Sequence, residues 1–204
     1  SKKNDVFFSW LGDNLPWSEW HLSRTKRFLG ASIQKKVNLI QKILEEKNIN
    51  LINPNKIEKK SFDKIEKWAK SFNGNLVGLK KFGYKKQNLG LGVSSSLISI
   101  FHQSNFDTKK YHKTVYKSLK SSAIIYERSL ELINRIKPDY VVTFNNRFAT
   151  SLPIILAAKL KKIKIIRHER GSNFDKYEIF KKDVHNLSYR ADNVNFYWDS
   201  EKNL

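Results

Sequence analysis

The amino-acid sequence predicts an α/β domain, a Rossmann-like three-layer α/β/α fold with a mainly parallel sheet. Two observations lead to this prediction. Short runs of β-branched and aromatic residues alternate with longer stretches that have helical periodicity. The chain has 204 residues, 40% of them hydrophobic, so it is long enough to bury one sizeable core.

The clearest strand–helix–strand unit begins at Pro138. We expect a strand at 140–144, then a helix with Ser151 as its N-cap and Pro153 in its first turn. Apolar residues surround most of this helix, which predicts that it is buried. A second strand follows at 163–166, and a right-handed crossover would make the two strands parallel.

A similar unit is predicted near the N-terminus. Strands at 6–10 and 49–52 flank a helix at 31–47, whose apolar residues form one stripe. The two units together would supply four strands of the expected sheet.

The loop after the first predicted strand is unusually aromatic and carries Trp17, Trp20 and His21. We expect it to pack over the sheet as a lid. The alternative is a platform on which sugar rings stack.

Three further helices are expected. One has its N-cap at Ser61, and the longest covers 109–137 with lysines crowded in its first half. The segment Leu89–Ser96 is rich in glycine but lacks a dinucleotide or P-loop spacing, so we expect a glycine turn before a helix that starts near 94–96. Near the end, Val194–Trp198 is predicted as a final strand or an interdomain connector.

Composition limits the chemistry. Without cysteine the chain has no disulfide framework, no thiolate nucleophile and no zinc–cysteine site. The formal charge of +20 and the pI near 10.0 predict an anionic partner such as nucleic acid, a membrane surface or phosphorylated sugars. The alternative is a compositional bias, because Lys, Asn and Ile are all abundant.

Two polar segments follow the strands of the central unit. Asn145–Arg147 comes directly after the first strand, and His168–Gly171 is expected to be a loop after the second. In an open parallel sheet, ligands bind outside the carboxyl ends of the strands. We therefore expect the two segments to meet and to form a site for a charged, hydroxyl-rich ligand.

The same stretch resembles a known family. The motifs are FNNRFA, PIILAAK and HERGS, then Tyr177 with Phe180, and His185 with Asn186. Together they resemble the N-terminal half of a bacterial capsular polysaccharide biosynthesis family, whose members are thought to be glycosyltransferases of the two-domain GT-B type. The family pattern has Gly where this chain has Asn146, and Asn still tolerates a left-handed turn.

The resemblance implies a glycosyltransferase with Glu169 or His168 as the base that deprotonates the acceptor, and His185 in reserve. The loop arginines would bind phosphate or position Glu169, and Asn145 would orient a hydroxyl. The implied substrate-binding residues are Asn145, Asn146, Arg147, Arg170, Gly171 and His185. No Asp-x-Asp motif is present, so we expect no metal, and the nucleotide-sugar is a co-substrate rather than a cofactor.

The resemblance also implies a division of the chain. Residues 1–190 would be the acceptor-side domain, and 191–204 would begin a connector to a C-terminal domain that binds the nucleotide-sugar. We expect the chain to be a piece of a longer protein and to be inactive alone. The implied acceptor is a polysaccharide or a lipid-linked sugar. The implied location is the cytoplasm, with peripheral contact at the inner face of the plasma membrane.

Other readings of these residues remain open. Glu169 and Arg170 are neighbours and would tie the two loops together through Arg147 without any catalysis. A basic module that binds nucleic acid or a membrane surface would explain the charge directly. Nucleic acid is the less expected partner, since no known nucleic-acid-binding motif is present. A non-catalytic relative of the same fold is a further alternative.

Overall fold

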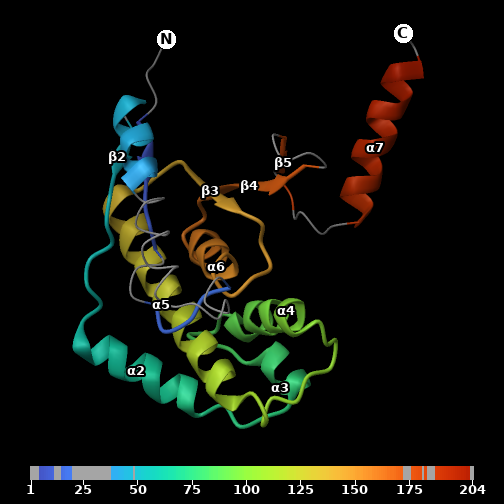
Figure 1. Ribbon diagram of the computed structural model, residues 1–204. Helices are drawn as coiled ribbons and strands as arrows, with labels where there is room; N and C mark the ends of the chain where they lie inside the picture. Colours follow the sequence, from blue (N-terminus) through green and yellow to red (C-terminus); the bar gives the residue numbers. More distant parts are fainter. Residues whose placement is uncertain are drawn as a thin grey trace.

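A computed structural model gives the arrangement of the chain. It describes residues 5–11, 15–19, 38–47, 49–171, 176–180, 182 and 187–202. The mixed α/β class is confirmed. The described strands form two small sheets rather than one continuous parallel sheet, so the three-layer arrangement is not seen within them (Figure 1).

The first sheet lies near the N-terminus. Strand β1 (Phe7–Phe8) pairs in parallel with β2 (Asn50–Leu51), and residues 38–46 between them are helical. The predicted strand–helix–strand order is therefore confirmed, with strands shorter than 6–10 and 49–52.

Four helices form the body of the protein: α2 (Lys59–Lys70), α3 (Leu76–Lys81), α4 (Leu89–Phe101) and α5 (His112–Ile136). The N-cap of α2 is Glu58, so the prediction of Ser61 was three residues late. Before α5, the Asp107 carboxylate accepts from the amides of Lys109 and Lys110 at 2.8 and 3.3 Å. These bonds hold a separate turn, which is why the helix begins later than 109.

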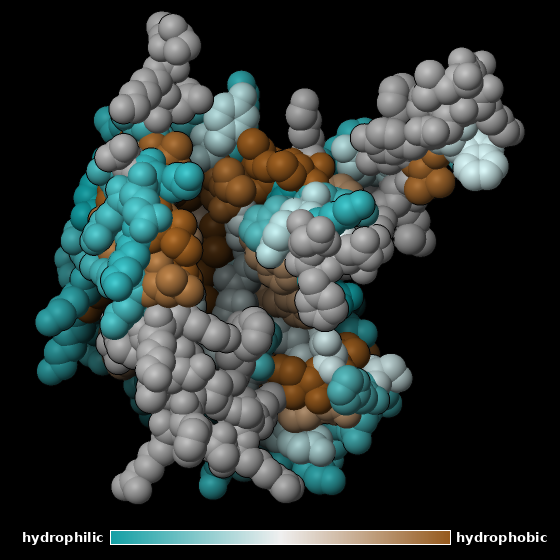
Figure 2. Space-filling model, turned by 45° about the horizontal axis from the view of Figure 1, so that its top comes forward, coloured by the Kyte–Doolittle hydropathy of each residue, from teal (hydrophilic) through white to brown (hydrophobic). Residues whose placement is uncertain are grey.

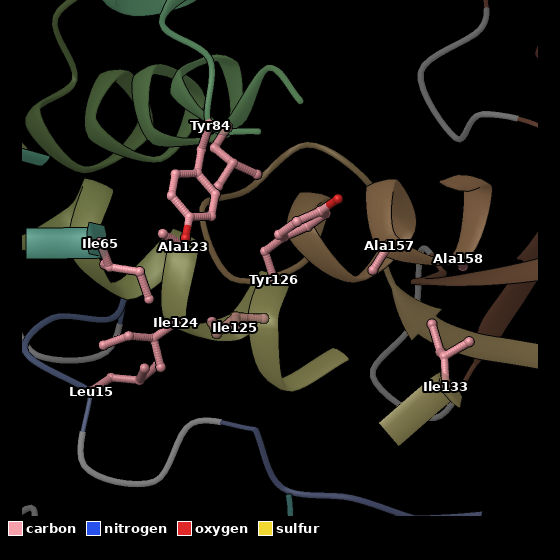
Figure 3. Close-up of a cluster of buried hydrophobic side chains, with 11 residues drawn as sticks. Leu15, Ile65, Tyr84, Ala123, Ile124, Ile125, Tyr126, Ile133, Ala157 and Ala158 are labelled. Atoms are coloured by element: carbon pink, nitrogen blue, oxygen red, sulfur yellow. The ribbon is translucent and has the colours of Figure 1, made fainter. Parts of the chain in front are cut away.

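Helix α5 lies at the centre of the molecule. It contacts α2, α4 and α6 (Leu152–Leu160), and residues 121–126 in its middle are all buried. Figure 3 shows Ala123 and Tyr126 of α5 between Ile65 and Tyr84 on one side and Ala157 on the other. A 25-residue helix therefore connects the two parts of the hydrophobic core.

The glycine-rich segment is part of a helix, not the turn that we predicted. Helix α4 begins at Leu89, where the Asn88 side chain accepts from the Leu91 amide at 3.3 Å. A Cβ on Gly90 would lie 2.0 Å from the carbonyl oxygen of Leu79, and one on Gly92 would lie 3.0 Å from the carbonyl oxygen of Phe148. The glycines are needed because two other backbone segments pass directly against this helix.

The second sheet contains the central unit. Strand β3 (Tyr140–Phe144) pairs in parallel with β4 (Lys164–Arg170), and α6 lies between them in sequence. The predicted strand–helix–strand unit is confirmed, and so are the positions of Ser151 and Pro153 at the start of α6. Strand β4 runs four residues beyond 166, because β5 (Tyr177–Phe180) pairs with it in the antiparallel direction.

Among the described elements, helices cover one face of this sheet. Helix α6 packs on it, and α5 packs behind α6. The other face, which points up in Figure 1, is exposed at alternate residues of β3. Helix α7 (Leu187–Lys202) stands away from the body, so Val194–Trp198 is helical and not a strand. It crosses the predicted domain boundary after residue 190. None of the described helices is long and apolar enough to cross a bilayer.

Replacing Gly90 with Ala should destabilise the protein by about 3 kcal/mol, because the new methyl group meets backbone oxygens that cannot move aside. Gly78 is the matched control. Its Cβ would have no neighbour closer than 3.6 Å, so Gly78→Ala should stabilise helix α3 by about 0.5–1 kcal/mol. Urea denaturation measures both. Equal effects of the two substitutions would show that the close approach at Gly90 is not a constraint.

Glu66 connects α2 to α5 by charge. Its carboxylate lies 2.7 Å from the Lys70 ammonium and 3.0 Å from that of Lys120, and these two cations lower the pKa of Glu66 from 4.5 to about 2. A carboxyl group whose pKa is lowered by folding stabilises the fold at pH values above its unfolded pKa. This stabilisation is lost as the pH falls through the lowered pKa of the folded protein.

Above pH 4.5 the wild type should therefore unfold at a higher urea concentration than Glu66→Gln. The difference between the two urea midpoints should vanish as the pH approaches about 2. Denaturation curves over this range measure it. A difference that stays constant with pH would mean that the two ion pairs contribute nothing.

Candidate functional site

The turn after β3 is shaped by Asn145. Its backbone has a φ of 51°, the left-handed region that Asn tolerates better than most residues. Its side-chain oxygen accepts from the amides of Asn146 and Arg147 at 2.5 and 3.1 Å. Its own amide donates to the carbonyl of His168 at 2.9 Å, which extends the parallel pairing by one residue. The left-handed position is thus Asn145, and not Asn146 as the family pattern suggested.

Glu169 meets this turn from the neighbouring strand. One carboxylate oxygen accepts from the side-chain amide of Asn145, and the other accepts from the backbone amide of Arg170 at 3.1 Å. Asn145 is buried and Glu169 is half-buried. The prediction that the carboxyl ends of the two strands meet is confirmed, and this pair is the side-chain contact between them.

The predicted loop at His168–Gly171 is wrong in its first three residues, which belong to β4. Side chains alternate along a strand, so His168 and Arg170 lie on the exposed face and Glu169 lies on the α6 face. The His168 ring packs against Phe144 and Tyr177, with centroids 5.4 and 6.0 Å apart. The two predicted catalytic bases therefore face opposite sides of the sheet.

The other predicted residues are arranged around this pair. Arg147 is exposed, with its guanidinium 4.7 Å from the centre of the Phe148 ring. Asn146 is buried, and its side-chain oxygen has no hydrogen-bond partner among the described residues. Gly171 donates to the carbonyl of Lys176 at 2.8 Å, in the turn between β4 and β5. His185 lies outside the described residues.

The alternative in which charges tie the two loops is not what the contacts show. Among the described residues, the Glu169 carboxylate is bound by an amide side chain and a backbone amide, and no ion pair joins it to Arg147. The guanidinium of Arg147 thus stays exposed beside the site.

Sequence reasoning missed Glu19. One of its carboxylate oxygens accepts from the Ser96 hydroxyl at 2.7 Å and from the Thr150 amide at 3.3 Å, and the other accepts from the Thr150 hydroxyl at 2.8 Å. The Ser96 hydroxyl in turn accepts from the Ala149 amide at 2.8 Å. Glu19 thus fastens the aromatic loop to α4 and to the turn before α6. The only signal in the sequence was a carboxylate within an aromatic segment.

Where the structure describes it, the aromatic loop packs against helices and not over the sheet as we predicted. Trp17 is buried, and its backbone amide donates to the Ser121 hydroxyl of α5 at 2.9 Å. Trp17 is thus a core residue between α4 and α5, and the prediction of a lid over the sheet is wrong at this position. Trp20 and His21 lie outside the described residues.

An open recess elsewhere is not connected with these residues. It lies between the first sheet and the end of α5, and it is lined by Phe7, Leu51, Ile52, Asn53, Arg135 and Ile136. Within the described ranges, no three His, Asp or Glu side chains are grouped as ligands for a metal ion.

Comparisons of the chain with protein-family models, curated proteins and solved structures found no match. The chemistry of the site is therefore argued from its geometry. A carboxylate, an amide and an exposed guanidinium come together at the carboxyl ends of two parallel strands, where a polar ligand can be held and deprotonated.

Glu19→Ala should cost about 1–3 kcal/mol of stability, because the substitution removes three hydrogen bonds to a carboxylate and leaves partly buried hydroxyls unsatisfied. Chemical denaturation measures this cost. Glu45→Ala is a control at an exposed helical position and should have little effect. If the two variants unfold at the same urea concentration, the Glu19 contacts do not hold the loop.

Proposed function

We propose that the chain is the acceptor-side domain of a GT-B-type glycosyltransferase. It would help transfer a sugar from a nucleotide-sugar to a surface or capsular polysaccharide or to a lipid-linked acceptor. The observation that carries the proposal is the contact of Asn145 with Glu169 at the carboxyl ends of two parallel strands. The resemblance of the motifs around these residues supports it, and a Rossmann-like arrangement of the whole domain is part of it.

Sugar transfer requires a base near the acceptor hydroxyl. Glu169 takes this role, because it is half-buried and is held in position by two hydrogen bonds. The side-chain oxygen of Asn145 accepts from two backbone amides of the turn, which fixes the orientation of the side chain. Its side-chain amide group then donates to Glu169 and keeps the carboxylate oriented. His168 faces the other side of the sheet, so it is not a second base for the same hydroxyl.

The negative charge of the substrates is met by the exposed guanidinium of Arg147, beside the turn. Arg147 either neutralises a phosphate that develops charge during transfer or binds an anionic group of the acceptor. The nucleotide-sugar is bound by a second domain, so the 204 residues alone are expected to show no transfer.

A non-catalytic basic module is the second candidate, and the charge of +20 favours it. The two candidates differ at Glu169. A module that binds through its cations gains nothing from this carboxylate, whereas a transferase depends on it.

Glu169→Gln in the full-length protein should lower the transfer rate by about 10²–10⁴-fold, because the amide keeps the shape of the side chain and cannot take a proton. The assay follows labelled sugar from a panel of nucleotide-sugars into polysaccharide or lipid-linked acceptors. Acceptor binding, measured by saturation-transfer NMR, should be retained.

Glu58→Gln is the control, since it makes the same chemical change at an exposed position outside the site. A Glu169→Gln protein with the wild-type rate would refute the role of Glu169. Transfer by the 204-residue chain alone would refute the division between two domains.

A further inference from the structure

The uncovered face of the second sheet is unusually apolar for a surface. Val142 and Ile179 are 64% and 72% exposed on the outer strands, and Tyr177 is 65% exposed. Tyr140 and Phe144 lie on the same face of β3 and are also exposed. Figure 2 shows hydrophobic side chains together at the upper surface, where Figure 1 places β3 and β4. We call these five residues and the facing residues of β4 the open face.

The charges of the open face have one sign. The register places Lys164 and Arg170 of β4 on it, and both are exposed. The Lys164 ammonium lies 5.2 Å from the centre of the Tyr140 ring. The same strands carry two carboxylates, Glu169 and Glu178, which are neighbours in the register of β4 and β5. Because side chains alternate along a strand, both lie on the other side of the sheet, away from the open face. Within the described strands, the open face therefore combines apolar side chains with cations and holds no carboxylate.

This charge argues against a second copy of the chain as the occupant. In a symmetric dimer that packs face to face, the same patch meets itself, and two sets of Lys164 and Arg170 would come together. The formal charge of +20 on each copy adds to that repulsion. An anionic partner would instead be complementary to these cations.

The arrangement of the apolar residues then favours lipid over nucleic acid. Bases stack on flat ring faces. Here the rings of Phe144 and His168 are inclined by 62°, and so are those of His168 and Tyr177. The most exposed residue of the open face, Ile179, is aliphatic. Ile166 adds a further aliphatic side chain on β4, between the two outer strands. Aliphatic groups with tyrosines and cations beside them are the composition that inserts into a membrane interface.

We propose that the open face is a docking surface for an anionic lipid bilayer. Val142, Ile166 and Ile179 enter the boundary of the acyl chains, and Lys164 and Arg170 bind the lipid headgroups. Asn145 and Glu169 lie at the end of the same strands, and the Glu169 side chain is on the α6 face, away from the docked bilayer. The proposal does not depend on sugar transfer.

The test is flotation with two kinds of vesicle, one of equal parts phosphatidylglycerol and phosphatidylcholine and one of phosphatidylcholine alone. The protein should bind the first kind and not the second. The double variant Val142→Ser with Ile179→Ser should bind at least about tenfold more weakly, because two exposed apolar side chains no longer enter the membrane. Lys164→Ala should weaken binding about fivefold.

Matched variants separate this face from the general charge of the protein. Val77→Ser changes a valine that is 61% exposed on α3, and Lys80→Ala removes an exposed lysine of the same helix. Both should bind like wild type. Glu169→Gln should also bind like wild type, so a failure of the catalytic proposal would leave this result intact.

Several outcomes would overturn the proposal. These are equal binding to both vesicles, no binding to either, or equal losses for the α3 and open-face variants. Tighter binding of a single-stranded RNA, lost in the double variant, would assign the face to nucleic acid. A dimer that dissociates in that variant would assign it to a second copy. The thermal midpoint checks folding of the double variant, and Lys164→Ala supplies the answer if that variant unfolds.

Discussion

The structure depends on the burial of helix α5. Four of its serines, Ser118, Ser121, Ser122 and Ser129, are buried although they are polar. The hydroxyls of Ser118 and Ser129 donate to carbonyl oxygens one turn earlier, and Ser121 accepts from the amide of Trp17. Because these side chains are small, α2, α4 and α6 can all approach the helix closely. The position of α6, and with it the strands of the second sheet, follows from this packing.

Local patterns were sufficient where an element carries its own signals. The strand 140–144 and the helix that starts after Ser151 are as predicted, because β-branched residues, a cap and a proline mark them. The start of α4 was not predictable in this way. Gly90 usually indicates a turn, and only the carbonyls of Leu79 and Phe82 beside it explain why a helix needs glycine there. Contacts that are distant in sequence decide this position.

The sequence predicted that the two strand ends meet at the site, but not the face of the sheet on which each side chain lies. Parallel strands have their carboxyl ends at one edge, so the meeting of Asn145 with Glu169 follows from topology. The side of the sheet on which each residue lies does not follow, because it depends on how far β4 continues. The antiparallel partner β5 extends β4 through Arg170, and the alternation of side chains then separates His168 from Glu169. Glu19 was missed because nothing in the sequence shows that its loop reaches Thr150.

Asn145 performs two tasks with one side chain, and this limits what can replace it. Glycine would keep the left-handed turn and lose the link to Glu169. Aspartate would still accept the two backbone amides but would set one carboxylate against another. Alanine would lose both kinds of bond and strain the backbone as well. A substitution at Asn145 therefore alters the turn and the contact with Glu169 at the same time. In related sequences we expect these two positions to vary together.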